Sequence, residues 1–150
     1  PNNARRGDFT KTATGKANFT THKVSPLELS EGHLIMMTVR THDQYNTTIY
    51  GLNDRYRGVF NERRVIFMNE KDMQENRLNN LDVVDIKSHF NGEERIAEKF
   101  KVVAYPIPSK CCATYFPEAN VLVPIGSVAE KSNTPTSKFI KVTLEKRPAE

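Results

Sequence analysis

The sequence lacks tryptophan, contains two cysteines and has no long apolar run. Its longest nearly apolar stretch, Leu34 to Met37, is far shorter than the roughly 18 residues of a membrane-spanning helix. The N-terminal residues Pro-Asn-Asn-Ala-Arg-Arg are followed by no apolar core, so they do not have the form of a secretory signal. The sequence also begins without methionine. We therefore expect no membrane partner, and we expect a fragment of a longer chain or a processed chain.

The two cysteines, Cys111 and Cys112, are adjacent. Neighbouring residues of a strand point to opposite faces, which predicts one thiol in the core, one at the surface and no disulfide between them. There is no Cys-x-x-Cys pair, and the 4 histidines show no chelating spacing, so we expect neither a metal ligand nor an iron–sulfur cysteine here. The low cysteine content fits a reducing, cytoplasmic compartment.

The excess of positive over negative charge is also small, because 22 Lys and Arg against 18 Asp and Glu give a net charge of +4. The basic residues are scattered among acidic ones, whereas a nucleic-acid-binding protein usually clusters them on one element. This balance suits an anionic small ligand as well as a polynucleotide. Because the charges are scattered, we favour a phosphate-bearing cofactor and expect no nucleic-acid partner. At 150 residues the chain has the length of a single domain with its own core.

Hydrophobic periodicity and turn signals predict a β-rich domain. Seven extended segments are expected, at residues 16–24, 33–39, 64–68, 81–88, 93–105, 110–116 and 138–144. Asn69 is expected to cap the one clear helix, which runs to Leu78, and Asn91-Gly92 is a strong hairpin signal. A long loop is expected at residues 124–137. This series favours a barrel over a parallel α/β sheet.

A polar segment, Arg40 to Thr48, directly follows the expected strand at residues 33–39. Almost every side chain in it can donate or accept a hydrogen bond, as in a cradle for a phosphate and a heterocycle. Arg40 can offer a phosphate oxygen a charged fork, and the amide of Gln44 can pair with the edge of a ring. The other hydroxyl and amide groups belong to Thr41, Asn46, Thr47 and Thr48. The alternative for this segment is a solvated loop.

Three further segments carry weaker signals. Tyr115 and Asn120 could face a planar ligand, or they could belong to an ordinary strand end. Ser137 and Lys138 could place a hydroxyl and an ammonium near an anion at the start of a strand. Taken alone, these two segments are better explained as a strand end and a solvated loop. The run Arg55-Tyr56-Arg57 is either a solvated face or a basic loop near the anion site.

Five stretches, in this order along the chain, resemble the C-terminal cofactor-binding domain of the molybdopterin oxidoreductases, and most of all the formate-dehydrogenase-like alpha subunits. They are Thr14–Phe19, Thr38–Gly51, Val65–Asp72, Tyr115–Leu122 and Asn133–Lys138. The resemblance implies a mainly β fold, a double-psi β-barrel with a few short helices. It implies a single domain with its barrel at residues 31–146, after an extension and connector at residues 1–30.

In that family the barrel closes over one pterin–guanine dinucleotide unit of a bis-cofactor. Carried over by position, the residues that would contact the cofactor are Arg40, Thr41, Gln44, Asn46, Thr47 and Thr48, with Tyr115, Asn120, Ser137 and Lys138 closing the far side. The implied cofactor is molybdopterin guanine dinucleotide with molybdenum or tungsten (Mo-bis-MGD in the parent enzyme). The implied partners are this cofactor, the remaining domains of the parent chain and an electron-transfer subunit.

The same resemblance places the metal's protein ligand, the iron–sulfur cysteines and the substrate-activating residues upstream of this chain. We therefore expect no catalytic residue here, and no turnover from these residues alone. One departure from the family concerns a Gly-Asp pair that usually precedes the strand at residue 82, because here the chain reads Asn80-Leu81-Asp82. The rival hypothesis is a stand-alone barrel that uses the same cleft for another ligand or a partner protein.

Overall fold

The computed structural model of the chain describes residues 6–24, 26–45 and 51–148. Its strands and helices lie between residues 34 and 146. They are β1 (Leu34–Val39), β2 (Val65–Met68), α1 (Glu70–Glu75), β3 (Val83–Phe90), β4 (Glu93–Ala104), β5 (Cys111–Tyr115), the 3-10 helix η2 (Asn120–Leu122) and β6 (Ile140–Lys146). Among the described residues, no helix is long and apolar enough to cross a membrane.

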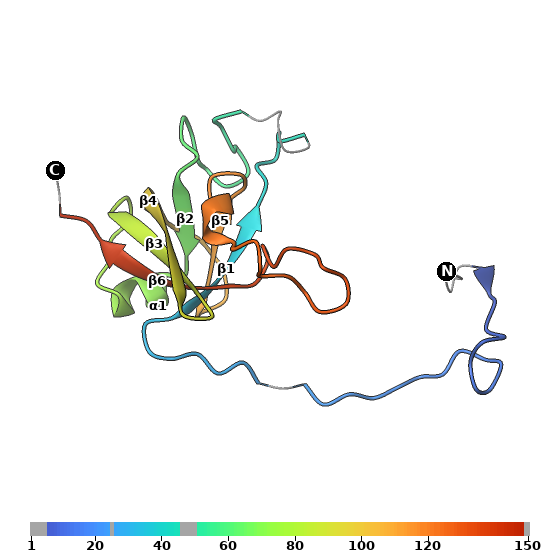
Figure 1. The fold of residues 1–150 in the computed structure, drawn as a ribbon. Helices are drawn as coiled ribbons and strands as arrows, with labels where there is room; N and C mark the ends of the chain where they lie inside the picture. Colours follow the sequence, from blue (N-terminus) through green and yellow to red (C-terminus); the bar gives the residue numbers. More distant parts are fainter. Residues whose placement is uncertain (1–5, 25, 46–50, 149–150) are drawn as a thin grey trace.

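The strands close into a barrel in the order β1-β5-β2-β4-β3-β6 (Figure 1). Two neighbouring pairs are parallel, β1 with β5 and β2 with β4, and the other four pairs are antiparallel. Parallel neighbours need crossover connections, which here run through the long segments between the strands. The mainly β fold and the double-psi type of barrel predicted from the sequence are confirmed.

Two hydrophobic clusters stabilise the barrel, one on each side of its wall. Side chains alternate across a strand, so Ile66 and Met68 of β2 point into the main core while Val65 and Phe67 point outward. All four β2 residues are nevertheless buried, because the outer face is covered by a second cluster. Its buried members are Val59, Val65, Phe67, Ala113 and Tyr115. The segment that contains Val59 thus lies against the outside of β2 and β5.

Several local predictions are confirmed. Asn91 and Gly92 connect β3 and β4 with φ of 49° and 83°, the left-handed pair that a two-residue hairpin turn needs. Asn69 caps α1, since its side chain accepts a hydrogen bond from the Lys71 backbone N–H. Cys112 is buried in the main core and Cys111 is partly exposed, both as free thiols, and burial raises the pKa of the Cys112 thiol.

Two predictions about the elements were wrong. Residues 16–24 form no strand, so the barrel has six strands rather than seven. The closed barrel leaves no open edge on which such a strand could pair, and Figure 1 shows residues 6–24 running away from it. The helix ends at Glu75 rather than Leu78, because Arg77 adopts a left-handed φ of 55° that an α-helix cannot continue.

The turn before β3 shows the effect of the missing glycine. The strand was expected to start at Leu81 but starts at Val83. Leu81 has φ of 71°, a left-handed conformation that glycine adopts without cost and a leucine adopts with strain. Its backbone N–H still donates to the Val102 carbonyl, at 2.8 Å, while its side chain is 62% exposed. The barrel imposes the turn on a residue poorly suited to it.

We predict that Leu81→Gly stabilises the chain by about 1 kcal/mol, because it relieves the left-handed strain and removes a side chain that contributes little burial. The free energy of unfolding from urea denaturation checks this. Leu81→Ala is the matched control, since it removes the same exposed side chain but keeps a Cβ in the strained conformation. An equal gain in both variants would show that backbone strain is not the cause.

Candidate functional site

Three segments meet at the barrel end where β1 and β5 finish. These strands run parallel with Val39 beside Tyr115, and the Phe116 N–H donates to the Val39 carbonyl at 2.8 Å. The polar segment after β1 and the loop after β5 therefore leave the barrel side by side. A third segment joins them, because the Thr38 N–H donates to the Ser137 carbonyl at 2.9 Å.

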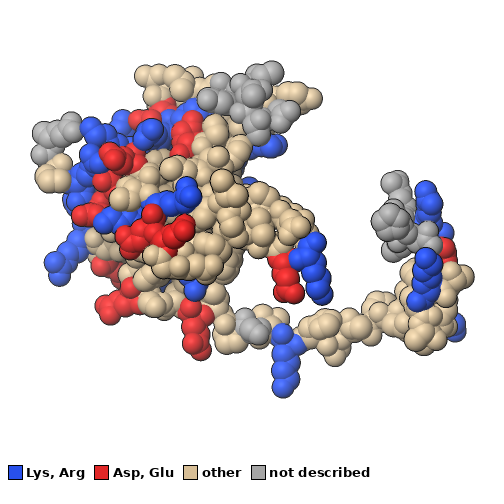
Figure 2. All heavy atoms as spheres, viewed as in Figure 1, with Lys and Arg blue, Asp and Glu red and all other residues tan. Residues whose placement is uncertain are grey.

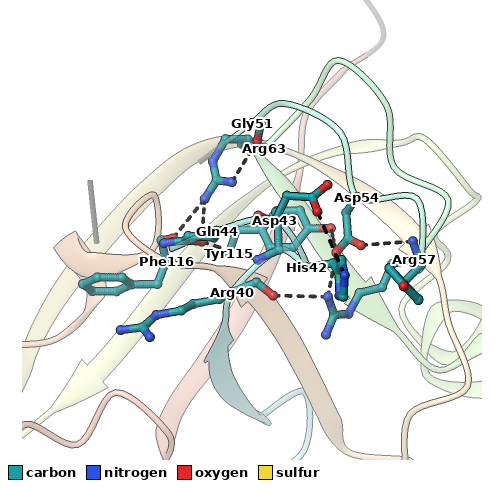
Figure 3. Close-up of polar contacts among 12 residues, drawn as sticks. Arg40, His42, Asp43, Gln44, Gly51, Asp54, Arg57, Arg63, Tyr115 and Phe116 are labelled. Atoms are coloured by element: carbon teal, nitrogen blue, oxygen red, sulfur yellow. Dashed lines mark hydrogen bonds and ion pairs between the residues drawn. The ribbon is translucent and has the colours of Figure 1, made fainter. Parts of the chain in front are cut away.

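Two exposed cations at this end are Arg40 and Lys138. The Arg40 side chain is exposed, and no acidic residue of the described ranges pairs with it. Figure 3 shows its guanidinium pointing away from the other labelled arginines. The Lys138 ammonium donates to the Thr38 carbonyl and lies 3.4 Å from the Thr38 hydroxyl. That contact anchors the lysine beside the end of β1.

Thr41 follows Arg40 and is buried at 4% exposure. Its Oγ1 has no hydrogen-bond partner among the described residues. A buried polar atom without a partner costs free energy, so this hydroxyl is a group whose hydrogen bond the described residues leave unfilled. Asn120 begins η2 and is exposed, while Ser137 is half-buried.

Gln44 holds two loops together. It is buried, and its Nε2 donates to the Phe116 carbonyl at 3.0 Å. Its Oε1 accepts from the Thr41 N–H at 3.4 Å and from Arg63 at 3.3 Å. The amide that was expected to pair with the edge of a ligand ring thus cross-links the segments after β1 and β5. Asn46, Thr47 and Thr48, which belong to the same predicted set, lie outside the described residues.

Tyr115 lies on the outer face of the barrel wall. Alternation along β5 points it outward, beneath the segment that contains Val59, and none of its surface is exposed. Its hydroxyl donates to Asp54 Oδ2 at 2.8 Å, and its ring meets Phe67 edge-on, with centroids 5.4 Å apart. Burial and the Asp54 carboxylate raise the pKa of this hydroxyl. In this structure Tyr115 therefore packs beneath the segment that contains Val59 and bonds to Asp54, and its hydroxyl does not face solvent.

Arg63 is the centre of the polar network at this end (Figure 3). Its guanidinium is 4% exposed and pairs with Glu118, with Nε 2.6 Å from Oε1 and Nη2 3.1 Å from Oε2. It also donates to the carbonyls of Phe116, at 2.9 Å, and Gly51, at 3.3 Å. Together with its bond to Gln44, these contacts fasten the loops after β1 and β5 to the start of β2.

A second charged group, Asp54, fixes the hairpin of residues 54–59, which is closed by an antiparallel bridge between Asp54 and Val59. Asp54 is fully buried and its Oδ2 lies 2.6 Å from Arg57 Nη1. The same Nη1 donates to the Arg40 carbonyl at 3.2 Å, which ties the hairpin to the polar segment. Burial alone would raise the pKa of Asp54, but the hydrogen bonds from Arg57 and Tyr115 outweigh it and hold the pKa below its usual range.

Neither Arg63 nor Asp54 was among the residues predicted for the site. Glu118 lies 55 positions from Arg63 in the sequence, so no local pattern links the two. The sequence gives a weak signal for the hairpin, because one of the two interpretations of the basic run at residues 55–57 is a loop near an anion site. The structure places that run beside the backbone of Arg40, through the hydrogen bond from Arg57 to the Arg40 carbonyl.

Elsewhere the charges are mixed. Figure 2 shows basic and acidic side chains intermixed over β3, β4 and β6 on the face drawn. Ion pairs such as Arg147 with Asp85 and Lys87 with Glu145 account for part of this surface. In the part of the chain that the structure describes, no group of three His, Cys, Asp or Glu side chains could hold a metal ion. The described cations at the barrel end, Arg40 and Lys138, have no such acidic partner in that part of the chain.

Comparison with known proteins identifies the family of the chain. A family model described as "Molydopterin dinucleotide binding domain" matches residues 34–141, well over half of the chain, and the chain belongs to this family. The match begins at the first residue of β1 and ends within β6. The cofactor-binding domain predicted from the sequence is confirmed, while the likeness to formate dehydrogenases stays a prediction.

The relatives are much longer than this chain. It is 48% identical over 140 residues to an uncharacterized oxidoreductase of Mycobacterium tuberculosis (strain ATCC 25618 / H37Rv), an alignment covering 90% of this chain and 18% of that protein. It is 41% identical over 140 residues to the protein YdeP of Escherichia coli (strain K12), covering 89% of this chain and 18% of that protein. The chain thus spans about a fifth of the length of the curated relatives it matches.

We predict that Arg63→Met lowers the free energy of unfolding by about 3 kcal/mol or more, because it leaves the Glu118 carboxylate without its partner in a largely buried place. Urea denaturation measures the loss. Arg64→Met is the control from the adjacent position, whose arginine is exposed; we expect a loss of about 1 kcal/mol or less there. If both variants lose equally, Arg63 is not the centre of the network.

We predict that Asp54→Asn makes the free energy of unfolding less dependent on pH in the acidic range. The pKa of Asp54 is lower in the folded chain than its ordinary 3.8, so its contribution is complete above that pH and is lost as the pH falls through the lowered value. The difference in unfolding free energy between the wild type and Asp54→Asn should therefore shrink from about pH 7 to about pH 3. A difference that stays constant or grows would contradict the lowered pKa.

Proposed function

We propose that this chain holds molybdopterin guanine dinucleotide at the barrel end where β1 and β5 finish. In this proposal the chain is the cofactor-binding domain of a larger molybdenum or tungsten oxidoreductase related to the formate dehydrogenases. The family membership supports the dinucleotide, and the length of the oxidoreductase relatives supports the larger protein. The remaining domains of that protein would cover the other side of the cofactor.

The observation that carries this proposal is a group of donors gathered at one barrel end. Arg40 has an exposed guanidinium, Lys138 has an ammonium beside the end of β1, and Thr41 has a buried hydroxyl without a partner among the described residues. A pyrophosphate needs charged and neutral donors of this kind. The residues present therefore fit the phosphate part of the cofactor.

The predicted site residues take two roles in this proposal. Arg40, Thr41, Ser137, Lys138 and Asn120 contact the cofactor, and Asn46, Thr47 and Thr48 remain in this set. Gln44 and Tyr115 position the contacts instead, since their polar groups are bound to Phe116, Arg63 and Asp54. Each neutral hydrogen bond contributes roughly 1 kcal/mol, so tight retention needs an array of donors rather than one.

When bound, the cofactor supplies the redox chemistry of its metal, and the residues of this chain bind and orient it. The metal's protein ligand and any iron–sulfur cysteines would belong to other parts of the parent enzyme. We infer formate or a related small molecule as the substrate, an electron-transfer subunit as a further partner and the cytoplasm as the location. The resemblance noted in the sequence supports the substrate and the partner, and the low cysteine content supports the location.

We predict that Arg40→Ala lowers the cofactor content of a full-length oxidoreductase that contains this chain. The loss of a charged donor to phosphate should weaken retention about tenfold or more. The measurement is the amount of pterin, guanine nucleotide and metal that remains in the purified protein after gel filtration and is released by denaturation.

Arg77→Ala serves as the control, because Arg77 is an exposed arginine that follows α1. Its variant should keep the wild-type content. Unchanged pterin and nucleotide in Arg40→Ala would remove Arg40 from the site. A wild-type protein that carries no pterin at all would refute the proposed function.

A further inference from the structure

Tyr115, which the sequence offered for a planar ligand, is buried, so within the proposed function the ring needs a different, exposed surface. We propose that His42, Arg55 and Tyr56 form a stacking shelf for the fused bicyclic ring of a diphosphate-bearing ligand. This inference rests on the proposed function and assigns one part of the cofactor to one part of the site. The bicyclic ring is either the guanine or the pterin, which share this chemistry.

The rings of the shelf are exposed and already in contact. The centroids of His42 and Tyr56 lie 3.9 Å apart at an interplanar angle of 44°. Tyr56 is 64% exposed, although a large aromatic side chain normally gains from burial. The Arg55 guanidinium carbon lies 5.2 Å from the Tyr56 ring centroid. Aromatic and guanidinium planes together form the surface on which nucleobases stack.

The shelf is held rigidly before any ligand arrives. Tyr56 lies in a hairpin closed by the hydrogen bond from the Asp54 N–H to the Val59 carbonyl, at 2.7 Å. The Tyr56 N–H donates to Asp54 Oδ1 at 3.2 Å, and Gly58 provides the left-handed turn with φ of 68°. A preorganised surface loses little conformational entropy on binding.

The shelf also lies next to the backbone of Arg40, whose side chain is proposed for the phosphates. His42 is two residues from Arg40, and Arg57, the neighbour of Tyr56, donates to the Arg40 carbonyl at 3.2 Å. Within the described residues, Arg55 has no acidic partner. The exposed carboxylate of Asp43 is the opposing charge here, 4.0 Å from His42 Nε2. In this proposal the phosphates meet Arg40 and the ring lies on Tyr56, on the same side of the molecule as the Arg57 bond to the Arg40 backbone.

The test uses a full-length oxidoreductase that contains this chain, purified without cofactor, and isothermal titration calorimetry. The three probes are guanosine diphosphate, 6-hydroxymethylpterin diphosphate and inorganic pyrophosphate. We expect Tyr56→Ala to weaken binding of one of the two ring-bearing probes about tenfold or more, and to leave pyrophosphate binding within about twofold. The probe that loses affinity identifies which ring occupies the shelf. Tyr56→Phe should retain wild-type affinity.

Phe60→Ala is the matched control, because Phe60 follows the same hairpin and is also 64% exposed. It should change the affinity of none of the three probes. An equal loss of pyrophosphate binding in Tyr56→Ala would overturn the shelf, since the whole loop would then have moved. Unchanged affinity for both ring-bearing probes, or no wild-type binding of either, would also overturn it.

The pterin content of the protein purified with its cofactor separates this inference from the proposed function. If Arg40→Ala loses pterin and Tyr56→Ala keeps it, the shelf is wrong and the proposed function stands. If Tyr56→Ala lowers only the melting temperature of the full-length protein, the rings pack against another domain and the shelf is wrong. A wild-type protein without pterin refutes the proposed function itself.

Discussion

The buried ion pair between Arg63 and Glu118 is the interaction on which the candidate site depends. Its two residues come from the start of β2 and the loop after β5, and the same guanidinium reaches the carbonyl of Gly51. A buried charge is costly unless its hydrogen-bonding capacity is filled. Because the carbonyls and the carboxylate around Arg63 fill it, the loops are held in one arrangement.

This arrangement divides the polar residues at the barrel end into two groups. Gln44, Asp54 and Tyr115 are buried and bonded to other parts of the chain, so they shape the loops. Arg40 and Asn120 are exposed and can meet a ligand. For the proposed anionic ligand, the residues beneath the exposed groups are already bonded in place. Binding would therefore cost little conformational entropy of the loops.

The sequence predicted what local pattern determines. The Asn91-Gly92 turn, the Asn69 cap and the opposite orientations of the two cysteines depend on neighbouring residues alone. The orientation of Tyr115 could not be predicted in this way, because it depends on the distant segment that covers the outer face of β5. The same holds for the pairing of Arg63 with Glu118, which only the closed barrel brings together.

The strand order has a consequence for how the nascent chain acquires this structure. β1 is the first strand to be made, yet it pairs with β5 and β6, with Met36 beside both Cys112 and Ile140. Contacts so distant in sequence form slowly, whereas the β3–β4 hairpin is local. During synthesis β1 must therefore wait, with its backbone unpaired and its apolar residues unburied, until the last strands leave the ribosome. Of the six strands, β1 is thus the one whose edges stay unpaired for the longest part of synthesis.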